Sequence, residues 1–114
     1  MTTTREAIAA AATITDVTDV SPTARQNPTP GQGSVRLDRR LRDGSGFGWL
    51  DVWQVIIFLP QTIPAAETWL EAHLTDVMDA LGSELYVTAA TPSTIVLDTG
   101  TVPGVIIEGS REHN

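Results

Sequence analysis

Histidine is the residue that most often carries acid–base chemistry near neutral pH, and this chain of 114 residues contains two histidines. His113 lies in a polar tail. His73 lies at the edge of the apolar stripe of a predicted helix, where it suits a packing role, and Glu67 and Glu71 are acids near it in sequence. No HExxH, GxSxG or phosphate-loop motif is present. We therefore expect a protein that is not an enzyme, with no catalytic residue, metal or cofactor.

A glycine-rich segment, DGSGFG at residues 43–48, resembles the loops that bind nucleotide phosphates. Those loops lead from a strand into a helix, whose N-terminus helps to hold the phosphate, whereas this segment joins two predicted strands. It therefore predicts a hairpin turn. Asp16 and Asp19 lie in a polar, irregular stretch, and we interpret them as solvated side chains.

Arginine is the other residue type that is unevenly placed. All seven basic residues are arginines, and four of them, Arg36, Arg39, Arg40 and Arg42, fall within one predicted strand. Three interpretations stay open. The arginines are exposed and balanced by Asp38 and Asp43, they pair with acids of a neighbouring copy of the chain, or they contact nucleic-acid phosphates. The third is disfavoured by the formal net charge of −7.

Composition indicates one globular domain over residues 1–114, because 41% of the residues are hydrophobic and 18% are charged. The absence of cysteine excludes disulfides, thiolate metal sites and cysteine nucleophiles. The longest apolar run, residues 55–59, is far too short to cross a bilayer. No basic segment precedes an apolar stretch near residue 1, so we expect no signal peptide and no membrane association.

The first half of the chain predicts a helix and two strands. Thr3 and Glu6 have capping-box spacing before an alanine-rich run, which predicts a helix over residues 4–14. Val17 and Val20 suit a short strand, and an extended loop rich in proline and glycine follows over residues 21–33. Alternation over residues 34–42 predicts a strand with Val35, Leu37 and Leu41 on one face and Arg36, Arg40 and Arg42 on the other.

The second half begins with a strand over residues 49–59 that is apolar on both faces. Such a strand is either central in its sheet or covered by another subunit. The clearest helix follows over residues 63–81, with Thr62 as N-cap and Gly82 as its end. Its predicted outer face carries four acids: Glu67, Glu71, Asp76 and Asp79.

Two short strands over residues 85–90 and 94–98 are expected next, joined around Pro92, and residues 102–108 extend the second strand or form another. Residues 110–114 are expected to be a frayed tail. Trp53 and Trp69 suit the core between sheet and helix, whereas Trp49 suits a rim or an interface. The order of elements predicts an α+β fold: a mostly antiparallel β-sheet with a short N-terminal helix and one long helix packed on it.

Four consecutive segments carry a resemblance to a known family: PGQGSVRLDRR, DGSGFGWLDVWQVIIFLP, AAETWLEAHLTDVMDAL and ELYVTAATPSTIVLDTGTVPGVIIEG. In size, element order and segment character, residues 4–109 resemble the tail terminator proteins of long-tailed (siphovirus-type) bacteriophages of actinobacteria. The resemblance implies a homohexameric ring in the neck of the virion, made in the host cytoplasm. Such a ring caps the head-proximal end of the tail tube and ends its polymerisation.

The same resemblance implies the partners of the ring. These are the tail tube protein, the head–tail connector or stopper protein, and DNA that passes through the lumen without sequence-specific binding. Under it, the arginine strand, the acidic helix and Trp49 become candidates for the subunit or lumen interface. The alternatives are another head–tail connector or neck completion protein, and a monomeric binding module unrelated to phages. Mass in solution, alone and with tube protein, distinguishes the module from the first two.

Overall fold

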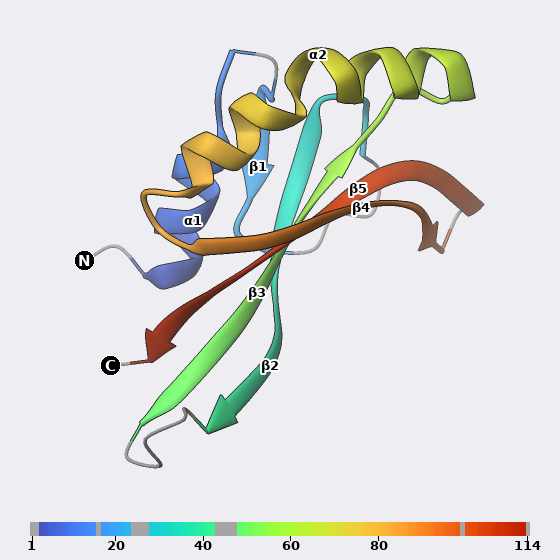
Figure 1. Ribbon diagram of the computed structural model, residues 1–114. Helices are drawn as coiled ribbons and strands as arrows, with labels where there is room; N and C mark the ends of the chain where they lie inside the picture. Colours follow the sequence, from blue (N-terminus) through green and yellow to red (C-terminus); the bar gives the residue numbers. More distant parts are fainter. Residues whose placement is uncertain (1–2, 16, 24–27, 43–47, 99, 114) are drawn as a thin grey trace.

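The chain folds into a five-stranded sheet with two helices on one face, as seen in a computed structural model that describes residues 3–15, 17–23, 28–42, 48–98 and 100–113 (Figure 1). The strands lie in the order β1-β2-β3-β5-β4, and all neighbouring strands are antiparallel except the β1–β2 pair. The elements are α1 (Thr4–Ala12), β1 (Asp19–Ser21), β2 (Gln32–Arg42), β3 (Trp49–Phe58), α2 (Ile63–Leu81), β4 (Tyr86–Leu97) and β5 (Gly100–His113). The predicted α+β class is confirmed.

The core lies between the helices and one face of the sheet. Ile8 of α1 and Val77 and Leu81 of α2 are fully buried against Ile57 and Ile107 of the two central strands. Because β3 pairs with β2 on one side and with β5 on the other, it is a central strand, which is the first of the two alternatives that its apolar faces predict. No helix among the described residues is long and apolar enough to cross a membrane.

Both helices begin close to where the sequence predicts. The capping box at α1 forms, since the Thr3 hydroxyl accepts from the Glu6 amide and the Glu6 carboxylate accepts from the Thr3 amide. The helix ends two residues earlier than predicted, at Ala12, because Ile14 turns into a bridge with Val17. The predicted bounds of α2 are confirmed, although Thr62 caps the helix without a side-chain hydrogen bond.

The β2–β3 hairpin extends past the helices, as the lower part of Figure 1 shows. Burial changes abruptly along β2: residues 33–35 are buried, and every residue from Arg36 to Arg42 is exposed. We call residues 37–42 of β2 together with residues 49–52 of β3 the arm. Its projection contributes to an elongated molecule with principal extents of 46 × 29 × 28 Å. The predicted hairpin loop lies largely outside the described residues, which omit 43–47.

A β-bulge in the arm overturns the predicted faces of β2. The register shifts between Leu37 and Arg39, so that Leu37 pairs with Trp53 and Arg39 pairs with Val52. An extra residue in one strand moves all later side chains to the opposite face. Arg36 and Arg39 therefore share one face, whereas Arg40 and Arg42 lie on the helix side, and Leu41 leaves the face of Val35.

The C-terminal hairpin also differs from the prediction. The segments predicted as two strands around Pro92 form the single strand β4, because β4 is an edge strand and an edge tolerates a residue without an N–H group. The predicted frayed tail is wrong for residues 110–113, which pair with residues 49–52 of β3 and so extend β5 to His113. The predicted loop over residues 21–33 is shortened, since Ser21 ends β1 and Gln32 begins β2; residues 24–27 lie outside the description.

The face of the sheet away from the helices has a small apolar cluster of its own. Ile56 and Phe58 of β3 are buried there. The β4–β5 hairpin folds over them, because Gly104 of β5 leaves room for Ile95 of β4: a Cβ atom at Gly104 would lie 2.6 Å from Ile95 Cγ1. A hollow of about 180 Å³ remains between this hairpin and the β2–β3 hairpin, with Arg36 at its lining.

Candidate interaction surfaces

The helix-side face of the arm holds a buried carboxylate. The side chain of Asp51 is 4% exposed and accepts two hydrogen bonds from Arg40, its cross-strand neighbour, one of them 3.1 Å long from Nη2 to Oδ2. This bidentate arrangement raises the pKa of Arg40 above its ordinary value, chiefly through the hydrogen bonds from its guanidinium. Arg40 thus compensates the charge of a carboxylate that is buried in the arm.

Farther along the same face, an arginine covers a tryptophan. The guanidinium of Arg42 lies 4.1 Å from the centre of the Trp49 ring, a cation–π distance, and the two residues are direct neighbours across the hairpin. Trp49 nevertheless remains 41% exposed. Near the body, Arg5 lies over the Trp53 ring at 5.5 Å, and the buried Trp53 indole N–H has no acceptor among the described residues.

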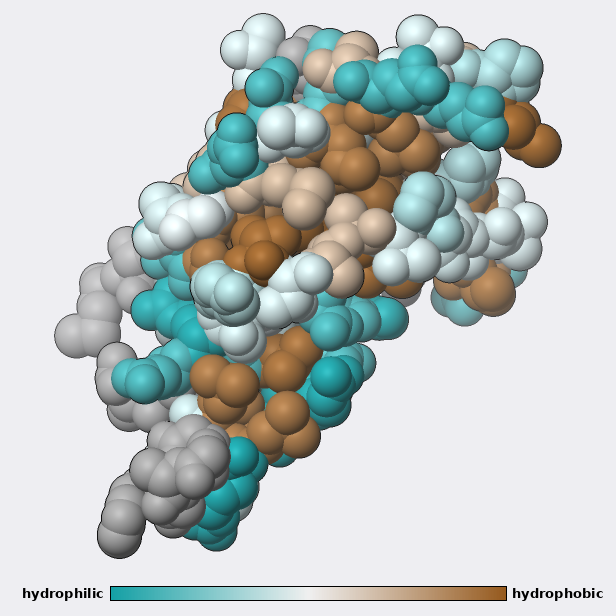
Figure 2. Space-filling view, viewed as in Figure 1, coloured by the Kyte–Doolittle hydropathy of each residue, from teal (hydrophilic) through white to brown (hydrophobic). Residues whose placement is uncertain are grey.

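On the opposite face of the sheet, a polar ladder across three strands lies next to the arm. Arg36 donates through Nε to Gln54, and Gln54 donates through Nε2 to Glu108 at 3.4 Å. Arg39 pairs with Asp38 and lies 3.8 Å from Glu108. Beyond this ladder, Leu41 is 42% exposed beside Leu50. Figure 2 shows apolar residues gathered on the arm between polar ones.

All four clustered arginines therefore contact partners in their own chain. Asp38 is one of those partners, as the first of the three interpretations requires, and Asp43 lies outside the described residues. Asp51, Gln54, Glu108 and the Trp49 ring were not among the partners that the sequence suggested. The signal was present in the alternation of β3, where Asp51 and Gln54 interrupt apolar runs on their two faces.

The acids of α2 show the opposite behaviour. Glu67, Glu71, Asp76 and Asp79 are all exposed, and none of them forms an ion pair with any other described residue. The last turn of the helix contains no basic residue that would balance Asp76 and Asp79. The structure thus leaves an acidic face on one side of the molecule and an arginine-bearing arm on the other.

Replacing Arg40 should destabilise the arm in a graded way. We expect the temperature of thermal unfolding to fall least for Arg40→Lys, more for Arg40→Gln and most for Arg40→Glu, which places a second carboxylate against Asp51. Arg36→Gln is the matched control, because the hydrogen bond described for Arg36 goes to the neutral amide of Gln54. Equal unfolding temperatures for Arg40→Glu and Arg36→Gln, measured by circular dichroism, would show that the Asp51 carboxylate does not depend on Arg40.

No cluster of catalytic groups is found in the described part of the chain. His73 lies edge-to-face against Trp69, with ring centroids 5.3 Å apart, and it is half-buried as the packing role requires. No group of three or more potential metal ligands occurs among the described residues. The side chain of His113 is outside the description.

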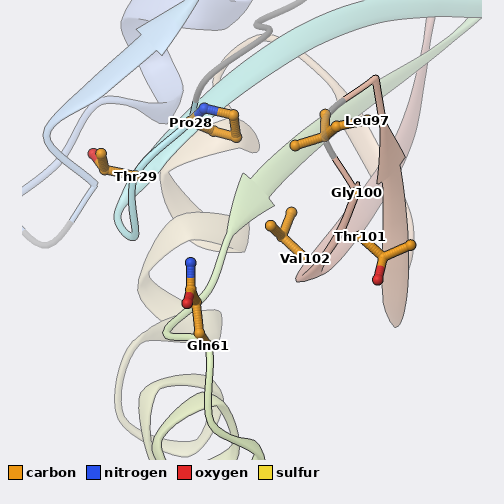
Figure 3. Close-up of a pocket in the computed structure, with 7 residues that line it drawn as sticks. All are labelled: Pro28, Thr29, Gln61, Leu97, Gly100, Thr101 and Val102. Carbon is orange, nitrogen blue, oxygen red and sulfur yellow. The ribbon is translucent and has the colours of Figure 1, made fainter.

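The largest hollow among those described, about 440 Å³, lies at the end of the sheet near the β4–β5 turn (Figure 3). Its described lining contains no ionisable side chain and consists of Pro28, Thr29, Gln61, Leu97, Gly100, Thr101 and Val102. Two threonine hydroxyls without a neighbouring base offer no activated nucleophile. The features that stand out are therefore surfaces, namely the arm and the acidic face of α2.

We compared the chain with known proteins. The chain matches no protein-family model and none of the curated proteins.

Proposed function

We propose that this chain is a tail terminator subunit of a long-tailed bacteriophage. In this role, copies of the chain form a ring, of six subunits by the family resemblance, at the head-proximal end of the tail tube. The ring ends tube polymerisation and joins the tail to the head connector, and DNA passes through its lumen. The function is structural, and the chain acts by binding other copies of itself and its neighbours in the particle.

The arm is the observation that carries this proposal. It extends past the helices and bears Leu37, Leu41 and Trp49 at 37%, 42% and 41% exposure. Leu37 and Trp49 lie on the helix-side face of the arm, and Leu41 lies on the opposite face. Large apolar side chains exposed on a projecting hairpin are typical of interaction sites, because their burial against a partner is favourable. Apart from the Arg42 guanidinium over Trp49, no described segment of this chain covers their exposed parts. A partner that does so would also cover the guanidinium of Arg42, which lies on Trp49.

Segregated charge supports assembly from identical subunits. A ring needs two different surfaces on each subunit, one complementary to the other, because each subunit contacts its neighbours head to tail. The basic arm and the acidic face of α2 are two such surfaces. At least one of the four clustered arginines, Arg36, Arg39, Arg40 and Arg42, is expected to pair with an acid of the adjacent copy. Exposed pairs of this kind contribute only ~0–1 kcal/mol, so they would set register more than strength.

Two measurements test the proposed function. Native mass spectrometry of the purified chain, alone and with tail tube protein, should detect a closed oligomer at six times the 12.2 kDa mass of the chain. Antibodies against the chain should label the junction of head and tail in electron micrographs of the virion. Labelling of the neck without a ring at the tube end would favour another neck protein. A monomer under all conditions, with no labelling of particles, would favour an unrelated binding module and overturn the proposal.

A further inference from the structure

Two strands have edges that no other described strand covers. β4 is the last strand of the sheet, and no described strand pairs with its outer edge over residues 86–97. Among the described residues, β2 pairs with β1 only at residues 32–34, so no described strand lies on its outer edge over residues 35–42. An uncovered edge presents backbone N–H and C=O groups that can pair with another strand. The molecule therefore carries two separate sites for strand addition.

The backbone hydrogen bonds define what the β4 edge presents. The Pro103 carbonyl accepts from the Leu59 amide, so it faces away from β4. Pro103 is paired with Thr94. In an antiparallel pair whose members do not bond each other, both residues direct their backbone groups outward. Thr94 therefore presents its N–H and C=O on the free edge, as does Val96 two residues later.

Only part of the β4 edge is open to pairing. Proteins protect sheet edges with prolines, bulges and charged residues. β4 has a bulge between Val87 and Ala89, and Pro92 removes one donor. Residues 93–97 have none of these devices: they are uncharged, and Val96 is 79% exposed. This composition is typical of a strand whose edge is paired with another strand in the assembled protein.

The β2 edge is better suited to pair with a different strand than with the β2 edge of a second copy. Arg5 donates to the Val35 carbonyl, which shows that Val35 directs its backbone groups outward, and Leu37 follows with the same orientation. Two arms side by side would bring their arginines together, and like charges across a strand pair are destabilising. The open part of β4 is neutral and is followed by the exposed Asp98. It can accept the basic arm without repulsion.

We infer that residues 93–97 of β4 pair with the outer edge of β2, from Leu37 along the arm, of a second copy of the chain. This inference rests on the proposed function, because it names a strand contact between neighbouring ring subunits. β4 runs antiparallel to β2 within one chain, since three antiparallel pairs separate them. When the strands of a neighbouring copy run in the same direction as those of the first copy, β4 of one copy is antiparallel to β2 of the other. Their pairing joins the sheets of successive subunits into one continuous sheet.

Cysteine cross-linking tests the contact directly, because the chain has no cysteine of its own. Leu37 and Val96 lie on the helix side of the sheet and are both exposed, by 37% and 79%. Oxidation of a mixture of Leu37→Cys and Val96→Cys should give a disulfide-linked dimer, and either variant alone should give less than a tenth of that yield. Thr94→Cys, on the same face as Val96, tests a pairing of the two strands that is shifted by two residues. Tyr86→Cys, 77% exposed at the other end of β4, is the control and should not react with Leu37→Cys.

The outcomes separate this contact from the proposed function. A double variant, Leu37→Cys with Val96→Cys, should give a ladder of linked subunits that ends at the closed ring. Rings in native mass spectrometry without cross-links from either Val96→Cys or Thr94→Cys would overturn the strand contact and leave the ring intact. Linked dimers from Val96→Cys alone would instead indicate a symmetric β4–β4 contact and would also overturn it. Absence of oligomers and cross-links, with and without tube protein, would overturn both proposals.

Discussion

Ile57→Ala should lower the free energy of unfolding by about 4 kcal/mol, near the upper part of the range for a large-to-small change in a core. Ile57 is fully buried in the middle of β3, and its neighbours across the sheet are Gly33 and Val105. Gly33 has no side chain that could move into the vacated space: a Cβ atom there would lie 2.9 Å from Ile57 Cδ1. The cavity therefore stays largely empty. Thermal unfolding should shift downward by about 15 °C.

Ile63→Ala is the matched control for this change. The same atoms are removed, but Ile63 is 73% exposed in the first turn of α2, where alanine is also a better helix former. We expect a change of less than about 0.5 kcal/mol in chemical denaturation. A loss below about 1 kcal/mol for Ile57→Ala would mean that the sheet is not packed against the helices as described.

The helices could be predicted from sequence because their signals are local. Thr62, Pro64 and Gly82 mark the ends of α2, and the apolar period between them is unbroken, so the predicted bounds were correct. The same logic found the capping box of α1. The two apolar faces of strand β3 predict either a central position or cover by another subunit, and its pairing with β2 and β5 shows the central position.

The strand errors arose where tertiary pairing overrides a local signal. Pro92 is a typical breaker of strands, but its missing N–H faces outward on an edge, so β4 continues through it. The bulge beside Leu37 has no glycine or proline to mark it. It depends on the alignment with β3, and that alignment separates Arg36 from Arg40, which the alternation alone placed together.

The candidate surfaces were predicted in part. The acids of α2 were expected to point outward, and they are exposed without partners among the described residues. The partners of the arginines could not be predicted, because Asp51, Gln54 and Glu108 reach them only through strand pairing. The open edges of β2 and β4 could not be predicted from the sequence for the same reason. An edge is defined by the order of strands in the sheet, which no local pattern specifies.

Thr94→Pro should prevent assembly while leaving the subunit folded. Thr94 directs its N–H toward the open edge, so proline removes a donor that the subunit itself does not use, as Pro92 already does two residues earlier. Across the proposed contact, the same change removes one hydrogen bond and leaves the facing carbonyl of the second copy unpaired. That loss costs about 1–3 kcal/mol per contact, which raises the dissociation constant of each contact by roughly 5-fold to 150-fold.

Thr94→Val is the control, because it retains the backbone N–H and a β-branched side chain of similar size on the same face. We expect Thr94→Val to form rings at the concentration that suffices for the unchanged chain. Thr94→Pro should remain monomeric there in native mass spectrometry, with an unchanged far-ultraviolet circular dichroism spectrum. If Thr94→Pro unfolds, Thr94 faces β5 and the deduced edge is wrong. If it stays folded and still forms rings, the subunits join through another surface, and the exposed acids of α2 become the first candidates for that contact.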